Sequence, residues 1–198
     1  MLSTEISKRS TSVPTLLQFE VDSLLSQAQA TNRRDWIMID LALNTGLRNS
    51  ELIALPIECI KSYETIVNIL SLPGTIAKGG RPRDIPLRPD IRTHLELFLL
   101  WKRDRGESLG PTDFLFVSKF THNKLSPRDF QRILTKISAK SIGRSIHPHV
   151  LRHTFATRLL SVSNLRIVQQ VLGHVNLQTT QIYTHPSNDD VSAAINRL

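Results

Sequence analysis

HPHVLRHTFAT (residues 147–157) is followed in the chain by LGHVNLQTT (172–180) and then by IYTH (182–185). The side chains of these motifs that could take part in a reaction are His149, Arg152, His174 and Tyr183. Arginine binds phosphate, histidine moves protons, and a tyrosine oxygen can attack phosphorus. The motifs therefore predict covalent chemistry on a nucleic-acid backbone, and the rest of the chain has to agree with it.

Two further cationic side chains stand far upstream of these motifs. Arg48 lies in TGLRNSEL (45–52), where one predicted helix stops at Gly46 and the N–H groups of the next would favour an anion. Lys78 lies in AKGGRPRDIPL (77–87), at the tip of a predicted hairpin. From there a lysine could reach a DNA groove or a scissile bond.

The upstream residues also have ordinary structural interpretations. Arg48 could form a surface pair with Glu51, three residues on. Lys78 could be one more exposed hairpin lysine. Arg81 and Arg83, on the same hairpin, are expected to touch DNA backbone or solvent.

The charge balance favours an acidic partner. The chain has 25 Lys and Arg against 17 Asp and Glu, a net charge of +8, and an isoelectric point near 10.1. Such a balance is typical of proteins that bind nucleic acid or another acidic surface. Only 6% of the residues are aromatic, which argues against a stacking platform for single strands. Double-stranded DNA bound through its phosphates is the predicted partner.

Hydropathy and cysteine content limit the possible location. The longest apolar run is LFLLW (97–101), far short of the ~20 residues that span a bilayer. The N-terminus has no apolar signal segment. The single cysteine, Cys59, excludes an internal disulfide and fits a reducing cytoplasm. We therefore expect a cytoplasmic protein without membrane contact, in which Cys59 is a small core or surface residue.

Periodicity predicts an α+β fold that is mostly helical, with a small antiparallel three-stranded sheet. Helices are expected at 18–28, 32–43, 49–55, 89–103, 126–137, 149–161, 164–172 and 177–184. Strands are expected at 65–72, in a short run up to residue 78, and at 83–87, with 114–117 a short strand or buried linker. The predicted organisation is a flexible tail (1–14), one catalytic domain (15–186) and a C-terminal helix (187–198).

The histidines allow a metal site as an alternative. His149 and Arg152 are expected on one face of a helix that begins after Pro148, with His149 as a proton acceptor. His149 and His153 have the i, i+4 spacing of zinc ligands. A zinc peptidase, however, needs glutamate where Val150 stands, and no cysteine cluster is nearby. We therefore predict no metal and interpret His153 as a structural hydrogen-bonding residue.

The last two candidate site residues, His174 and Tyr183, are weak signals individually. His174 follows Gly173 and could be only the neighbour of a helix C-cap, and Tyr183 would ordinarily be half buried with its hydroxyl satisfied. Their order in the whole series is specific. With the flanks TGLRxSEL, HxLRHTFAT, LGH and TTQxYTH, the series resembles the tyrosine recombinases, the phage integrase family. The resemblance covers about residues 14–186.

The resemblance implies a role for each matched residue. These would be the clamping arginines Arg48 and Arg152, the hairpin lysine Lys78, the paired histidines His149 and His174, and the nucleophile Tyr183. Glu51 matches an acidic residue that supports the site without reacting. The reaction implied is DNA cleavage and rejoining through a 3′-phosphotyrosine, with no metal, ATP or other cofactor.

The resemblance also implies partners. In this family four protomers act on two DNA duplexes, so a homotetramer is expected, with the helix at 187–198 packing on a neighbouring protomer or on its own core. Most members carry an N-terminal DNA-clamping domain, whereas only a short tail precedes the first helix here. The chain thus looks like the small single-domain members that invert fimbrial promoters, and an accessory DNA-bending protein is a candidate partner.

Two alternative functions stay open at this stage. A type IB topoisomerase would use the same chemistry to cut and reseal one strand without exchange. A catalytically silent DNA-binding regulator would keep the fold and the charge without the reaction. The sequence does not choose between integration, excision, inversion and resolution.

Overall fold

The computed structural model describes residues 14–118 and 123–173 of the chain. Two predicted site residues, His174 and Tyr183, lie outside the described residues. The predicted helices at 177–184 and 187–198 lie outside them as well, as does nearly all of the predicted N-terminal tail.

The described part is mostly helical, as predicted. Its α-helices are α1 (Gln18–Thr31), α2 (Arg33–Thr45), α3 (Asn49–Ile53), α4 (Pro89–Asp104), α5 (Pro127–Ile142), α6 (Pro148–Val162) and α7 (Leu165–Leu172). A short 3-10 helix, η1 (Ile57–Cys59), follows α3. α3 ends at Ile53 and is therefore two residues shorter than the helix predicted at 49–55.

Local signals in the sequence set several helix ends. The Asn32 side chain accepts hydrogen bonds from the backbone N–H groups of Arg34 (2.9 Å) and Asp35 (3.4 Å), which satisfies donors that the first turn of α2 leaves unpaired. Ser126 caps α5 in the same way. α2 ends at Gly46, whose φ of 62° lies in the left-handed region that favours glycine.

The strands differ from the predicted three-stranded sheet. They form two separate antiparallel pairs, β1 (Lys61–Ser62) with β2 (Thr65–Ile66), and β3 (Ile69–Leu72) with β4 (Arg83–Pro86). The predicted single strand at 65–72 is interrupted because the chain bends at Asn68. Its first half therefore pairs with β1 on one side and its second half with β4.

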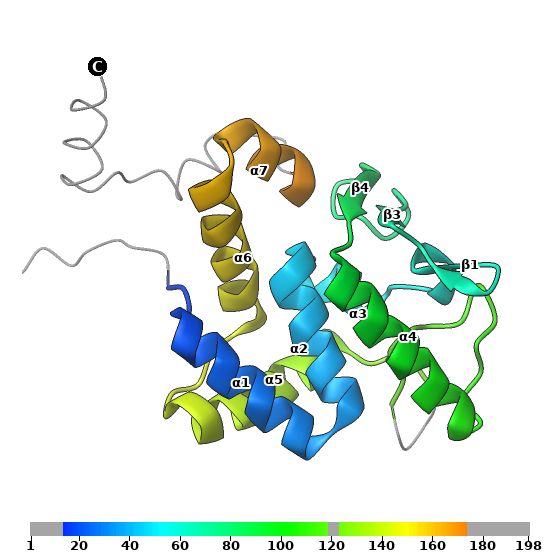
Figure 1. The fold of residues 1–198 in the computed structure, drawn as a ribbon, viewed down its shortest axis with the longest axis horizontal. Coiled ribbons are helices and arrows are strands. Elements are labelled where there is room, and N and C mark those ends of the chain that lie inside the picture. Colours follow the sequence, from blue (N-terminus) through cyan, green and yellow to red (C-terminus); the bar gives the residue numbers. More distant parts are fainter. Residues whose placement is uncertain (1–13, 119–122, 174–198) are drawn as a thin grey trace, which may run out of the picture.

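α2 is the central helix of the fold. It packs against α1, α4 and α6, and in Figure 1 it lies between α6 and α4. Ile37, Met38 and Ile39, three successive residues that therefore face different sides of α2, are all fully buried. In the described part of the chain, no helix combines the length and apolar character that crossing a membrane requires.

The linker before α5 joins the same core. Leu115 and Phe116 are fully buried, and the backbone N–H of Leu115 donates to the carbonyl of Leu55 (2.8 Å). The predicted short strand or buried linker at 114–117 is thus a buried linker with isolated bridges. Cys59 at the end of η1 is buried as well, and burial raises the pKa of its thiol to about 11.

α6 and α7 form a smaller apolar cluster of their own. Its buried members are Ala156, Val168 and Leu172. Gly46 at the end of α2 touches this cluster so closely that a Cβ there would lie 2.4 Å from Phe155 and 2.8 Å from Leu172. The end of α2 and the end of α7 are therefore in direct contact.

Gly46→Ala tests this contact. We expect the free energy of unfolding to fall by about 2–4 kcal/mol, from left-handed strain together with overpacking. Gly143→Ala is the matched control, because Gly143 also has a positive φ (69°) but a Cβ at this position would meet no atom within 4 Å. Strain alone should cost that variant about 1–2 kcal/mol. Equal losses in urea titrations of the two variants would contradict the close contact.

Candidate active site

One buried carboxylate organises the candidate site. Glu51 in α3 has no exposed side-chain surface. Its Oε1 accepts from Arg48 Nη1 (2.9 Å), Arg83 Nη1 (3.1 Å) and the backbone N–H of Lys78 (3.1 Å). Its Oε2 accepts from the backbone N–H of Arg48 (2.9 Å) and from Arg83 Nη2 (2.6 Å). Segments far apart in the sequence thus meet on Glu51.

The ionisation of Glu51 follows from these contacts. Burial by itself raises the pKa of this carboxyl, because a low-dielectric surrounding disfavours charge. The hydrogen bonds and charge of Arg83 and the backbone N–H groups of Arg48 and Lys78 outweigh burial and lower the pKa to about 2. Glu51 is therefore an anion at neutral pH and accepts hydrogen bonds at both oxygens.

The side chain of Arg83 is buried, whereas the sequence predicted that it would be at the surface. The sequence suggested contact with DNA backbone or solvent, but only 6% of its side chain is exposed. Besides its two bonds to Glu51, its Nε donates to the carbonyl of Val171 (3.0 Å) near the end of α7. Strand alternation was the available signal, because Arg83 lies two residues before the buried Ile85 and so faces the same side of β4.

Arg48 stands at the N-terminus of α3. Its side chain is 18% exposed and pairs with Glu51, the ordinary partner that the spacing suggested, although the pair is not on the surface. Its backbone N–H and its guanidinium both bind that carboxylate. The orientation of Arg48 is thus fixed from two points.

Arg152 in α6 is also buried, with 4% of its surface exposed. Its Nη1 donates to the carbonyl of Gly46, and its Nη2 donates to the carbonyl of Leu172 (2.9 Å). Arg152 therefore joins the end of α2 to the end of α7. Arg83 and Arg152 bind adjacent carbonyls of α7, where the partial negative charge of a helix C-terminus favours cations.

Lys78 lies in the loop between β3 and β4, as predicted. Its backbone N–H is fixed by Glu51, while the side chain is exposed. Within residues 14–118 and 123–173, its ammonium has no hydrogen-bond or ion-pair partner. The loop is thus anchored at its main chain, and the charged end extends from that anchor.

His149 lies one turn before Arg152 on α6 and is exposed. Its ring centroid is 6.4 Å from that of His153. Burial, with the neighbouring charges of His149 and Arg152, lowers the pKa of His153, so His153 is mainly neutral at pH 7. Among the described residues, no group of three His, Cys, Asp or Glu is arranged to hold a metal ion.

Four predicted site residues are therefore placed by the structure. Arg48 and the Lys78 loop are joined through Glu51, and Arg152 is joined to them through the ends of α2 and α7. No described contact ties the ring of His149 to Glu51. The chain leaves α7 at Gly173 and continues directly into His174, so the end that Arg83 and Arg152 hold is also the start of the segment that carries Tyr183.

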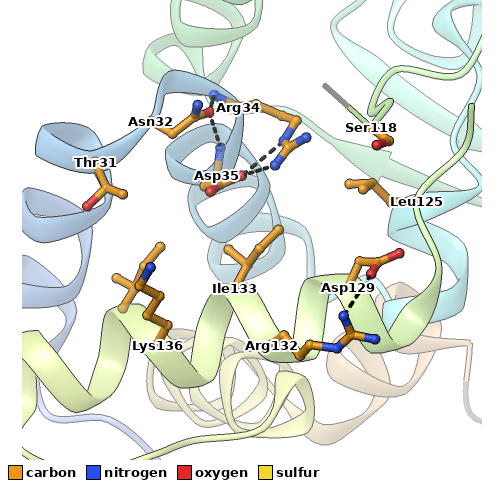
Figure 2. A pocket seen from close by; sticks show the side chains of 11 residues that line it. Thr31, Asn32, Arg34, Asp35, Ser118, Leu125, Asp129, Arg132, Ile133 and Lys136 are labelled. Carbon is orange, nitrogen blue, oxygen red and sulfur yellow. Dashed lines mark hydrogen bonds and ion pairs between the residues drawn. The ribbon is translucent and has the colours of Figure 1, made fainter. Parts of the chain in front are cut away.

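A separate cavity lies away from this cluster, between the start of α2 and α5 (Figure 2). Its volume is about 410 Å³, and it contains none of the predicted site residues. Its charges are largely matched, since Arg34 pairs with Asp35 at 2.7 Å and Arg132 lies 3.8 Å from Asp129. This cavity offers no concentrated positive charge for phosphate, unlike the arginines near α7.

Residues 14–189 match the Phage integrase family, which is most of the chain. The chain belongs to this family. The family resemblance stated from the sequence is thereby confirmed. The mostly helical α+β fold is also that of the catalytic domain of bacteriophage HP1 integrase, with a TM-score of 0.63 and 19% identity.

Similar proteins include both curated relatives and solved structures. A tyrosine recombinase of Pseudothermotoga lettingae is 38% identical over 92% of this chain and 60% of its own length. The structure of XerA recombinase has a TM-score of 0.77 and 26% identity, over 98% of this chain and 66% of that one. The Tn1549 transposon integrase, in complex with a circular intermediate DNA, has a TM-score of 0.73 and 26% identity, over 96% and 67%.

The curated relatives are longer than this chain. Others among them are named tyrosine recombinase XerC or XerD, and the chain spans 48% and 56% of two of them. It thus corresponds to part of each of these proteins. The narrower resemblance to fimbrial inversion recombinases stays a prediction, because these relatives carry Xer names.

Glu51→Gln tests whether the Glu51 carboxylate holds Arg48, Arg83 and the Lys78 loop together. The amide keeps the shape but removes the charge, which leaves Arg48 and Arg83 facing each other without a counter-ion. We expect the free energy of unfolding to fall by about 3–5 kcal/mol. Glu64→Gln is the control, because Glu64 is 94% exposed and its pair with Lys61 should be worth less than about 1 kcal/mol. Similar urea midpoints for the two variants would contradict the assignment.

The pH dependence of stability gives a second test. The folded pKa of Glu51, about 2, is below the ordinary value of 4.5. The stability contributed by this depressed pKa is fully present above pH 4.5 and is lost as the pH falls toward 2. The stability difference between the wild type and Glu51→Gln should therefore shrink over that range. A constant difference in urea titrations at successive pH values would contradict it.

Proposed function

We propose that this chain carries the catalytic centre of a site-specific DNA recombinase, which cleaves and rejoins strands through a 3′-phosphotyrosine. The observation that supports this most is the joining of Arg48, the Lys78 loop and Arg152 around Glu51 and the end of α7. This arrangement occurs in a chain that belongs to the phage integrase family. Related recombinases have been solved with DNA, including the Tn1549 integrase.

The proposed nucleophile is the phenolic oxygen of Tyr183. A phenol has a pKa of about 10, so only about one tyrosine in a thousand is ionised at pH 7, a deficit near 4 kcal/mol. Attack on phosphorus therefore needs a base and cationic neighbours. His149 is the proposed proton acceptor, since it is exposed on the same helix as Arg152.

The proposed cations act on the phosphate. Arg48 and Arg152 neutralise charge that develops on its non-bridging oxygens, and His174 donates a further hydrogen bond. The Tyr183 oxygen–phosphorus bond forms while the bond from phosphorus to the 5′ oxygen breaks. That oxygen would be a poor leaving group as an alkoxide, and Lys78 is the proposed proton donor to it.

Energy balance explains why no ATP is needed. One phosphodiester is exchanged for another, so the phosphotyrosine conserves the bond energy for rejoining. Positioning and charge supply the catalysis, and the guanidinium groups of Arg48 and Arg152 are already oriented by hydrogen bonds to protein. We propose that the site works without metal or other cofactor.

Double-stranded DNA is the proposed partner, in agreement with the net charge of +8. Four protomers on two duplexes, with the segment at 187–198 reaching a neighbour, remain the proposed assembly. A catalytic domain at 15–186 and the help of a DNA-bending protein are proposals of the same kind. The proposed outcome of recombination is one of four: integration, excision, resolution, or inversion of the kind that fimbrial recombinases carry out.

Tyr183→Phe tests the reaction. Genomic DNA fragments are incubated with the wild type, denatured, and covalent protein–DNA adducts are captured and sequenced to find the cleavage site. A nicked duplex that carries this site then traps the adduct, because the cleaved fragment diffuses away. We expect the wild type to accumulate adduct and Tyr183→Phe to form none, since phenylalanine lacks the attacking oxygen.

The outcomes separate the candidate functions. An adduct that persists in Tyr183→Phe would disprove the nucleophile. Relaxation of supercoiled DNA of any sequence, without a four-way junction intermediate, would favour the type IB topoisomerase. Sequence-specific binding by the wild type without any adduct would favour the silent regulator.

A further inference from the structure

We propose that Arg83 is a positioning residue of the site, which fixes Arg48 and the Lys78 loop through Glu51 and fixes the end of α7 through Val171. This inference rests on the proposed function, because the groups it positions are those assigned to DNA cleavage. It replaces the role in DNA or solvent contact that the sequence suggested for Arg83.

All three nitrogens of the Arg83 guanidinium are used within the protein. Nη1 and Nη2 donate to the two oxygens of Glu51 at 3.1 and 2.6 Å. Nε donates in another direction, to the carbonyl of Val171 at 3.0 Å. Nε, Nη1 and Nη2 of Arg83 are therefore all committed to protein acceptors, and its role is to join Glu51 to α7.

The geometry requires arginine at this position. A lysine ammonium is a single centre, whereas the guanidinium has a planar fork that binds both carboxylate oxygens together with a third acceptor. Close approach to α7 also depends on Gly173, since a Cβ there would lie 3.1 Å from Cδ of Arg83. β4 and α7 pack against each other at this point (Figure 1).

Each end of the bridge leads to a proposed reacting group. On one side Glu51 binds the guanidinium of Arg48 and the backbone of Lys78. On the other side Val171 precedes Leu172, whose carbonyl Arg152 binds, and the segment with His174 follows. Arg83 thus ties the first arginine of the site to the start of the segment that carries the nucleophile.

The expected consequence is a loss of rate without a matching loss of DNA affinity. Displacement of catalytic groups by about 1 Å can lower a rate about 100-fold, while Arg83, whose three nitrogens all donate to protein groups, contributes little to phosphate contact. For Arg83→Lys we expect single-turnover adduct formation on the nicked duplex to slow about 10- to 100-fold. The Kd for the same duplex should change less than about 3-fold, because the positive charge remains.

Arg83→Met and a matched control separate position from charge. Arg83→Met removes both the planar guanidinium and its charge. We expect it to form the adduct more slowly than Arg83→Lys. Arg103→Met removes the same charge from an exposed position on α4 and should cleave at the wild-type rate. Thermal unfolding of each variant is measured alongside. If Arg83→Met does not fold, the partial activity of the folded Arg83→Lys still decides the question.

The pH dependence of the cleavage rate gives a further test. A purely structural role of Arg83 would not change it. The side chains of Arg48 and Arg83 face Glu51. Arg83, with the backbone N–H groups of Arg48 and Lys78, holds the pKa of Glu51 at about 2 against burial. Without Arg83 this pKa rises. The cleavage rate of Arg83→Met should therefore fall more between pH 8 and pH 5 than that of the wild type. Addition of Glu51→Gln removes the titrating group and should abolish this extra fall.

Three results would overturn the inference. Cleavage by Arg83→Lys at the wild-type rate would show that the fork is not needed. Equal losses in rate and affinity would make Arg83 a DNA contact. An unchanged pH profile in Arg83→Met would remove the link to Glu51. Absence of adduct in the wild type, by contrast, would refute the proposed function itself.

Discussion

The carboxylate of Glu51 has no solvent to stabilise its charge, so the protein must supply every compensating hydrogen bond. It does so with Arg48, Arg83 and the backbone of the Lys78 loop, and these donors come from three separate segments. A buried anion of this kind constrains all its partners, because the displacement of one leaves charge unpaired at high cost. The local structure around α3, the loop before β4 and β4 itself follows from this requirement.

The same constraint extends to α7 through its C-terminal carbonyls. Arg83 binds Val171 and Arg152 binds Leu172, while Arg152 also binds Gly46 at the end of α2. Cations are thereby gathered where two helices end, in a region that excludes much of the solvent. For phosphate chemistry this is favourable, since charges already oriented by the protein need little reorganisation when a transition state forms.

Much of the fold could be predicted because its signals are local. Asn32, Ser126 and Gly46 set helix ends through single-residue capping, and proline opens α4, α5 and α6 in the first turn. The three-stranded sheet was wrong in detail because the pairing of strands depends on where the chain bends. Nothing in the apolar pattern of 65–72 marks Asn68 as the bend at which the partner strand changes.

For the candidate site, the sequence by itself determined the family and which residue types stand in which order, because motif spacing survives without coordinates. It also suggested the pairing of Arg48 with Glu51, a contact between neighbours on one helical turn. Only the tertiary structure decided that Glu51 is buried and that Arg83 binds it across 32 residues of sequence. It also decided that Gly46 receives Arg152 from 106 residues away. Burial and long-range hydrogen bonds arise when distant segments pack together, so they cannot be predicted from the neighbouring residues in the sequence.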